Sequence, residues 1–278
     1  MKVALCYSGQ LRTGIHCIKN QLEFLGEHAS ADKFLHTWNL NTNKRFPPWR
    51  QISTVPWSEI SRYTEVFGGF KQLIVEDPEK VGLFNRSRAA WLHDLSLYYS
   101  WKQSVLLALE GDYDVIVKIR PDMIFPPHRR LTDDLERAAE GIFLIDGLNW
   151  NPSWREATVT SDVYFVSSAA AAKVALGWVD LVYSRTHLGI SMGNWLIEQG
   201  VPVEGTKHSG YAIYRPEAIG LDSVDRYFDV RNIDGRFYHY NPECFHPSYE
   251  SFMKAPYNPF GGKINVIPAG VTSTYYPS

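Results

Sequence analysis

Cysteine is scarce in this 278-residue chain, which has only Cys6, Cys17 and Cys244 and no Cys-x-x-Cys pair. An odd number of widely spaced cysteines indicates neither a disulfide framework nor a structural zinc site. Because chains without disulfides are typical of reducing compartments, we expect a cytoplasmic location.

Long apolar runs and a strong excess of one charge are also missing. No window approaches about 18 uninterrupted apolar residues, the length that a membrane-spanning helix needs. The apolar start at residues 3–7 is too short for the core of a signal peptide. We therefore expect no transmembrane segment. The formal net charge of -2 and the pI near 6.5 indicate no general basic surface, so nucleic acid is not an expected partner.

Neither standard glycine signature of nucleotide binding is present. The segment SGQLRT at residues 8–13 follows the first predicted strand, but its spacing is neither Gly-x-Gly-x-x-Gly nor that of a P-loop. Backbone amides, a flexible glycine and an arginine between a strand and a helix nevertheless suit the phosphates of a nucleotide. Ser8, Gly9, Gln10 and Arg12 are therefore candidate nucleotide-binding residues, and the alternative is an ordinary strand-to-helix turn.

The composition is sufficient for a packed core, because 45% of the residues are hydrophobic and 14% are aromatic. Apolar runs predict strands, and apolar residues at helical spacing predict helices between them. The predicted strands are 3–7, 33–38, 73–75, 115–119, 142–145 and 163–166, and the predicted helices are 15–25, a short one from 58, 92–109, one from 132, and 169–183. This alternation indicates an α/β fold with a mainly parallel central sheet flanked by helices.

The regular pattern weakens after residue 205, in a tail rich in tyrosine, proline, glycine and histidine. Only short strand candidates, at 212–214 and 264–267, occur there. Earlier in the chain, the Phe-Pro-Pro-Trp segment at 46–49 predicts a connection that no regular element crosses. Because no internal repeat or linker divides the chain, we expect one domain, residues 1–278, with an irregular aromatic-rich C-terminal part.

The most informative stretch is residues 113–125, where a predicted buried strand ends in charged side chains. Pro121 stops this strand, and ligands of open α/β sheets bind at the carboxyl ends of strands. Arg120 and Asp122 therefore lie where substrate is expected. Asp122 is the candidate ligand of a divalent cation, and Arg120 can offset the charge of a diphosphate. The alternative is a structural ion pair at a strand end.

A second acidic pattern, Asp112-Tyr113-Asp114, matches Asp-x-Asp literally but precedes the same strand. Five strand residues at about 3.3 Å each place it about 17 Å from the carboxyl edge. We therefore expect it to lie away from the site.

Three more side chains are candidates for the pocket. His36 ends the second predicted strand at the same edge, where it can line the pocket, and the alternative is a satisfied core histidine. Asp162 precedes a predicted strand and is the first candidate for a general base, against the alternative of a solvated turn aspartate. Glu198, after a glycine-rich turn, is the reserve base, against the alternative of a solvated helix face.

Three stretches together, residues 3–12, 36–38 and 117–122, resemble bacterial and large-virus polysaccharide glycosyltransferases of the WavE-like group. The resemblance is good over the first 170 residues and weak beyond them. It implies a GT-A fold with a nucleotide-sugar donor, most commonly a uridine one, at the carboxyl edge of the sheet. It also implies a Mn²⁺ or Mg²⁺ ion on an Asp-x-Asp-type motif, whose last carboxylate Asp122 matches. Residues 1–125 would form the nucleotide-sugar half and 126–278 the acceptor half.

The resemblance departs from the metal motif at one position, because Arg120 stands where the first carboxylate is expected. A guanidinium can itself offset leaving-group charge, so the metal requirement stays open. The expected function is transfer of a hexosyl or pentosyl group to a hydroxyl of a glycan acceptor. An inverting reaction needs a base such as Asp162, and a retaining one does not. The alternatives are another nucleotide-dependent group transferase, such as a sulfotransferase, and a non-catalytic carbohydrate-binding protein.

Overall fold

The computed structural model describes most of the first 206 residues and short strands beyond them. The described ranges are 1–43, 51–78, 80–81, 92–125, 129–145, 148–151, 156–159, 164–184, 192–206, 212–213, 231–233, 236–238 and 267–268.

A seven-stranded sheet in the order β12-β8-β11-β6-β1-β2-β5 forms the centre of the fold. Its strands are β1 (Val3–Ser8), β2 (Asp32–Trp38), β5 (Gln72–Glu76), β6 (Val115–Ile119), β8 (Phe143–Ile145), β11 (Phe165–Ser168) and β12 (Val203–Gly205). Only β11 runs antiparallel to its neighbours, and the other pairs are parallel. The predicted mainly parallel sheet is therefore confirmed.

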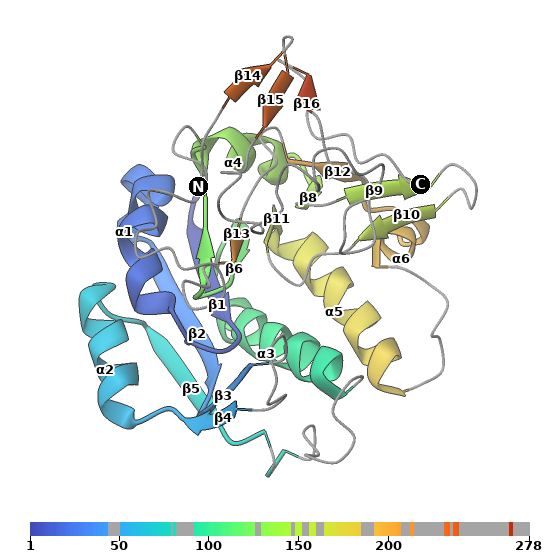
Figure 1. Ribbon diagram of the computed structural model, residues 1–278. Helices are drawn as coiled ribbons and strands as arrows, with labels where there is room; N and C mark the ends of the chain where they lie inside the picture. The colour runs from blue at the N-terminus through green and yellow to red at the C-terminus, as the bar shows by residue number, and fades with distance from the viewer. Residues whose placement is uncertain are drawn as a thin grey trace.

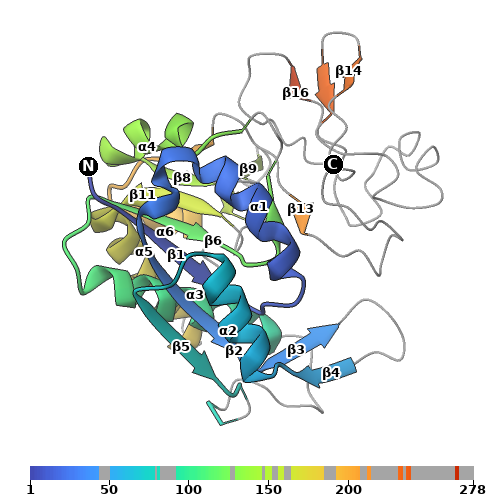
Figure 2. The ribbon, with the colours of Figure 1, turned by 90° about the vertical axis from the view of Figure 1, so that its left-hand side faces the viewer.

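Helices cover both faces of this sheet, as the sequence predicts. They are α1 (Gly14–Leu25), α2 (Trp57–Val66) and α4 (Thr132–Ala139) on one face, and α3 (Leu92–Leu109), α5 (Ala169–Ser184) and α6 (Met192–Glu198) on the other (Figures 1 and 2). A 3-10 turn, Gly26–Ser30, follows α1. Among the described residues, no helix is both long and apolar enough to cross a bilayer.

The strand β1 shows why the sheet is buried on both sides. Its side chains alternate between the two faces, so that Leu5 and Tyr7 pack with α1 and α2 while Ala4 and Cys6 pack with α3. All four are fully buried. Burial of a large apolar side chain contributes about 1.5–3 kcal/mol, which favours placing this apolar run in the middle of a parallel sheet.

Two predicted boundaries are explained by backbone hydrogen bonds. The N–H of Gly26, which has a φ of 55°, donates to the carbonyl of Leu22 and ends α1 where the sequence predicts. The hydroxyl of Ser168 accepts from the N–H of Ala171 at 3.2 Å and caps the start of α5.

The prediction of a purely irregular connection between β2 and α2 is wrong in part. The strands β3 (Leu40–Asn43) and β4 (Gln51–Thr54) form an antiparallel hairpin there, which projects beyond the end of β2 (Figure 2). The Phe-Pro-Pro-Trp segment itself lies outside the described residues. Both strands are short and mostly polar, so no period-two apolar pattern marked them.

Further short strands form small sheets beside the main one. They are β7 (Met123–Ile124) with β13 (Ala212–Ile213), β9 (Leu148–Asn151) with β10 (Glu156–Val159), and β14 (Arg231–Ile233), β15 (Arg236–Tyr238) and β16 (Ile267–Pro268) together. Because β13 pairs with β7, residues 212–213 lie beside the segment that follows β6. The assignment of donor and acceptor halves to residues 1–125 and 126–278 stays a prediction.

Candidate functional site

The candidate site lies where the order of the central sheet reverses. From β1 the chain continues to β2 and β5 on one side, and then returns to β6 on the other side. Because β1 and β6 are parallel and Tyr7 pairs with Ile119, Ser8 and Arg120 follow side by side at the carboxyl edge. Open α/β sheets bind their ligands at such a switch point. The structure therefore brings together the two segments that the sequence singled out.

Asp122 joins these two segments through its carboxylate. This side chain is 0% exposed and accepts hydrogen bonds from Arg120, with 3.0 Å from Nε to Oδ1 and 3.2 Å from Nη2 to Oδ2. Nη1 of Arg12 lies 3.8 Å from Oδ2. The side chains of Arg12 and Arg120 are 17% and 11% exposed, so each keeps an edge toward solvent. One buried carboxylate thus orients two guanidinium groups, which can bind an anion such as a diphosphate.

The surroundings of Asp122 suit a guanidinium better than a divalent cation. Mn²⁺ and Mg²⁺ bind several oxygen ligands, whereas both oxygens of this carboxylate accept from Arg120, and Arg12 is a second positive charge nearby. Within the part of the chain that the structure describes, no three histidine, cysteine or acidic side chains gather as a metal cluster. The metal role of Asp122 stays a prediction, and this geometry favours the guanidinium alternative.

The loop between β1 and α1 has an unusual backbone. Gly9 has a φ of 117° and Arg12 a φ of 42°, a left-handed conformation that non-glycine residues seldom adopt. The N–H of Arg12 donates to Oδ1 of Asn41 in β3 at 3.3 Å, and its Nε donates to Oε1 of Gln10 at 2.6 Å. Backbone strain held by several contacts is concentrated at functional sites. The loop that carries Arg12 is thus held to β3 through Asn41 and braced internally by Gln10.

Two residues of α1 that the sequence reasoning missed shape the segment after β6. Gln21 is fully buried, and its Nε2 donates to the carbonyls of Arg120, Pro121 and Met123 at 3.1, 3.0 and 2.7 Å. A Cβ on Gly14 would lie 3.1 Å from both Cβ and the carbonyl oxygen of Pro121. The signal for Gln21 was a polar residue on the apolar face of a predicted helix.

His36 is buried and hydrogen-bonded at both ring nitrogens, which agrees with the second of its two sequence interpretations, a satisfied core histidine. Its role in lining the pocket stays a prediction. Its ring is 0% exposed, with Nδ1 2.8 Å from Oγ of Ser100 and Nε2 2.9 Å from Oε2 of Glu76. Burial lowers the pKa of His36, and Glu76 opposes this shift only in part. Ser100 also accepts the N–H of Gly9 at 2.8 Å. His36 therefore contacts the loop of Gly9, between β1 and α1, both through Ser100 and through its own carbonyl oxygen, which lies 3.2 Å from the Gly9 nitrogen.

Of the two candidate bases the structure describes only Glu198, and it does not bring Glu198 to this cluster. Asp162 lies outside the described residues. Glu198 is exposed at the end of α6, which packs beside β12, and β12 is separated from β6 by two strands. This position agrees with the solvated helix face for Glu198.

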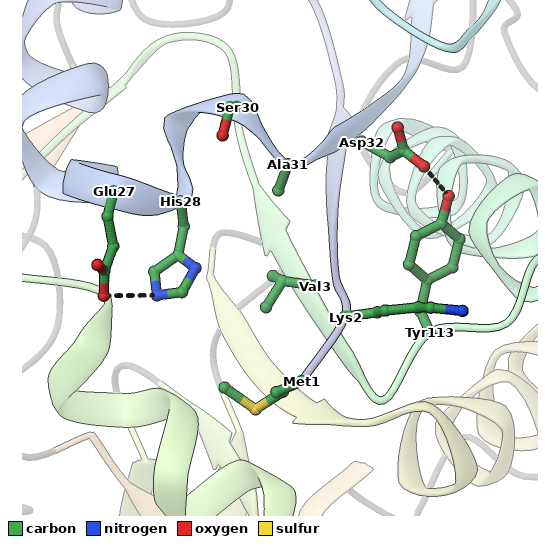
Figure 3. A pocket seen from close by; sticks show the side chains of 9 residues that line it. All are labelled: Met1, Lys2, Val3, Glu27, His28, Ser30, Ala31, Asp32 and Tyr113. Carbon is green, nitrogen blue, oxygen red and sulfur yellow. Dashed lines mark hydrogen bonds and ion pairs between the residues drawn. The ribbon is translucent and has the colours of Figure 1, made fainter.

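The acidic Asp112 and Asp114 lie at the opposite, amino end of the sheet, as the length of β6 predicts. Asp114 accepts from the N–H of Lys2 at 2.6 Å. A shallow hollow of about 280 Å³ is close by, and its polar side chains pair with one another, Glu27 with His28 and Asp32 with Tyr113 (Figure 3). Ligand pockets usually measure roughly 300–1,000 Å³ and enclose their ligand, so this hollow is not our candidate site.

Replacing His36 by glutamine is expected to reduce the loss of stability at acid pH. Because the pKa of His36 lies below 6.5 in the folded protein, the unfolded chain takes up this proton first as the pH falls. Its contribution to the free energy of unfolding is complete above pH 6.5 and is lost as the pH falls through the lowered pKa. Urea unfolding from about pH 7.5 to pH 5 measures this slope. The exposed His16→Gln serves as control, and equal slopes for His36→Gln and the wild type would contradict the assignment.

Comparisons with known proteins place few limits on the function. No protein-family model and no curated protein matches the chain. It is similar to the CTP:phosphocholine cytidylyltransferase LicC from Streptococcus pneumoniae, with 12% identity and a TM-score of 0.41, over 81% of this chain and 96% of that one. It is similar to a nucleoside-diphosphate-sugar pyrophosphorylase from Vibrio cholerae RC9, with 13% identity and a TM-score of 0.38, over 73% of this chain and 91% of that one. It is also similar to the galactosyltransferase LgtC, with 11% identity and a TM-score of 0.38, over 74% of this chain and 73% of that one.

These identities and TM-scores are too low to assign chemistry to the site, and none of the three structures named above bears the WavE-like name. The WavE-like resemblance therefore remains a prediction from the sequence. The function has to be argued from the residues at the switch point.

Proposed function

We propose that the protein is a glycosyltransferase of GT-A type. It would move a sugar from a nucleotide-sugar donor, with a UDP-sugar favoured by the sequence resemblance, to a hydroxyl of a glycan acceptor in polysaccharide or glycoprotein glycan assembly. The observation that carries this proposal is the pair of guanidinium groups, Arg12 and Arg120, held by the buried Asp122 at the switch point of the sheet.

The chemistry of glycosyl transfer explains why such a pair suits the reaction. The bond between the anomeric carbon and a diphosphate oxygen breaks, and the electron pair leaves with the nucleoside diphosphate. Groups that are already oriented toward this growing negative charge stabilise the transition state more than the bound substrate. Arg12 and Arg120 are largely withdrawn from water, which strengthens their attraction for phosphate oxygens.

The acceptor hydroxyl forms the new bond to the anomeric carbon and gives its proton to a base. We propose Asp162 for this base in an inverting reaction, on its place in the sequence alone. A divalent cation remains part of the proposal only as an option from the resemblance, and no step is assigned to it. The donor set around Asp122 favours binding of the diphosphate by arginine.

Replacing Arg120 by methionine is expected to weaken UDP binding about 10- to 100-fold, because each hydrogen bond to a charged group is worth about 1.5–3 kcal/mol. Calorimetric titration with UDP, GDP and CMP, each with and without Mn²⁺, measures the affinity and identifies the donor nucleotide. The matched control is Arg62→Met, at an exposed position on α2, which should bind as the wild type does.

The outcomes of this titration separate the candidate functions. Metal-independent binding that is lost in Arg120→Met supports the guanidinium site. Binding that requires Mn²⁺ and is insensitive to Arg120 would contradict it. Glycan affinity without affinity for any nucleotide would instead indicate the carbohydrate-binding alternative.

A further inference from the structure

A chain of hydrogen bonds connects β5, an edge strand of the sheet, to the loop of Gly9 between β1 and α1. It runs from Glu76 at the end of β5, through His36 in β2 and Ser100 in α3, to the backbone of Gly9. His36 and Ser100 are fully buried, whereas the Glu76 side chain is 31% exposed. Two elements, β2 and α3, thus contact one loop residue, and β5 is connected to it through His36.

The direction of each hydrogen bond follows from the chemistry of the groups. A carboxylate only accepts, so Nε2 of His36 carries the proton and donates to Glu76. The neutral ring then accepts at Nδ1 from the hydroxyl of Ser100, which also has the His36 carbonyl oxygen as a second acceptor at 3.2 Å. The oxygen of that hydroxyl accepts the N–H of Gly9 at 2.8 Å. Glu76 therefore determines the tautomer of His36, and this tautomer leaves Nδ1 as an acceptor for the Ser100 hydroxyl.

The order serine, histidine, carboxylate resembles the triad of a serine nucleophile, but Ser100 is not placed to attack a substrate. The Ser100 hydroxyl is 0% exposed and is already the acceptor for Gly9, so no substrate atom can reach it from solvent in this conformation. Ser100 can therefore affect the site only through its hydrogen bond to the loop of Gly9.

The chain of hydrogen bonds ends at Gly9, where the loop between β1 and α1 turns. Gly9 has a φ of 117°, and its N–H lies 3.2 Å from the His36 carbonyl as well. Three residues later, Arg12 extends to Asp122. At the other end, Tyr99 donates to Glu76 and its ring stacks on Trp38 at a centroid distance of 5.6 Å. The loop that carries a proposed phosphate ligand is thus anchored to β2 and α3, and β5 contacts this anchor through Glu76.

We propose that Glu76, His36 and Ser100 are positioning residues that hold the Gly9 loop in the conformation that binds the donor. The donor part of this inference rests on the proposed function, whereas the anchoring of the loop does not. The groups that face His36 are Glu76 from β5, Tyr99 and Ser100 from α3, and Trp38 from its own strand.

Hydrogen exchange of the ligand-free protein tests the anchoring. Ser100→Ala is expected to speed exchange of the Gly9 amide at least about tenfold, the equivalent of one lost hydrogen bond of about 1.4 kcal/mol, while the rest of β1 stays protected. Ser104→Ala is the matched control, because Ser104 is also fully buried on α3 but donates to the Trp101 carbonyl in its own helix. Equal exchange in both variants would overturn the proposal.

Titration with UDP tests the effect on the donor. Ser100→Ala and Glu76→Leu should each weaken binding about tenfold, whereas Glu76→Gln, which keeps an acceptor for Nε2, should restore it to within about threefold of the wild type. If Ser100→Ala does not fold, Glu76→Leu at its partly exposed position carries the test. Faster exchange without weaker binding would overturn the positioning role.

The failure of one inference can be told from the failure of the other. A wild-type protein that binds no nucleotide would contradict the proposed function, and the exchange experiment would still decide whether the anchor exists. If the wild type binds UDP and Ser100→Ala binds it equally tightly, the positioning role of the anchor is overturned.

Discussion

Replacing Asp122 by asparagine is expected to lower the free energy of unfolding by about 3 kcal/mol, the low end of the range for breaking a buried ion pair. The amide keeps the shape of the side chain but leaves Arg12 and Arg120 beside a neutral group in a site with little water. The low end applies because both guanidinium groups keep an edge toward solvent. Urea unfolding, read as a shift of the midpoint at constant slope, measures the change.

The control for this experiment is Asp112→Asn, which removes the same charge at the other end of the sheet. Asp112 is 96% exposed and pairs with Lys2, so a change within about 0.5 kcal/mol is expected. A similar midpoint for the two variants would show that Asp122 is not the organising charge of the site. Calorimetry with UDP on the folded Asp122→Asn protein should also show weaker binding, because the two guanidinium groups lose their common acceptor.

Replacing Gln21 by leucine is expected to lower the free energy of unfolding by about 2 kcal/mol, because buried acceptors lose their donor. The Nε2 of Gln21 donates to three carbonyls in the segment that carries Arg120. Among the described residues its Oε1 accepts no hydrogen bond, and leucine removes that unfavourable group, which limits the loss. Urea unfolding measures the stability, and UDP titration measures whether the segment still presents Arg120.

The matched control is Lys19→Leu, an exposed position on the same helix. It introduces the same side chain without touching the segment after β6, so its stability should change by no more than about 0.5 kcal/mol. Loss of UDP affinity in Gln21→Leu at unchanged stability would still support a role in shaping the site. Unchanged stability and unchanged affinity together would contradict it.

The central strands were predictable because their burial leaves a direct trace in the sequence. β1 and β6 are covered on both faces, so they read as short continuous apolar runs, and Pro121 marks the end of the second. The hairpin of β3 and β4 was not predictable in this way, because polar strands of four residues carry no period-two pattern. The backbone pairing there is decided by tertiary context.

The approximate place of the candidate site was also predictable. Residues that follow two parallel strands meet at one edge of the sheet, and this rule predicts from the sequence that the loop of Gly9 lies beside Arg120 and Asp122, as the pairing of β1 with β6 confirms. The rule says nothing about which group each side chain contacts. The sequence therefore left Asp122 open as a metal ligand or as a partner of arginine.

The sequence by itself determined the α/β class, the strands of the sheet's centre and the two segments at its carboxyl edge, because these depend on local apolar pattern and chain direction. The tertiary structure alone decided that Asp122 holds two guanidinium groups, that Gln21 shapes the segment beside it, and that Ser100 anchors Gly9. Except for the Arg120–Asp122 pair, these contacts join residues far apart in the chain, and all their side-chain directions are set only when the helices pack on the sheet.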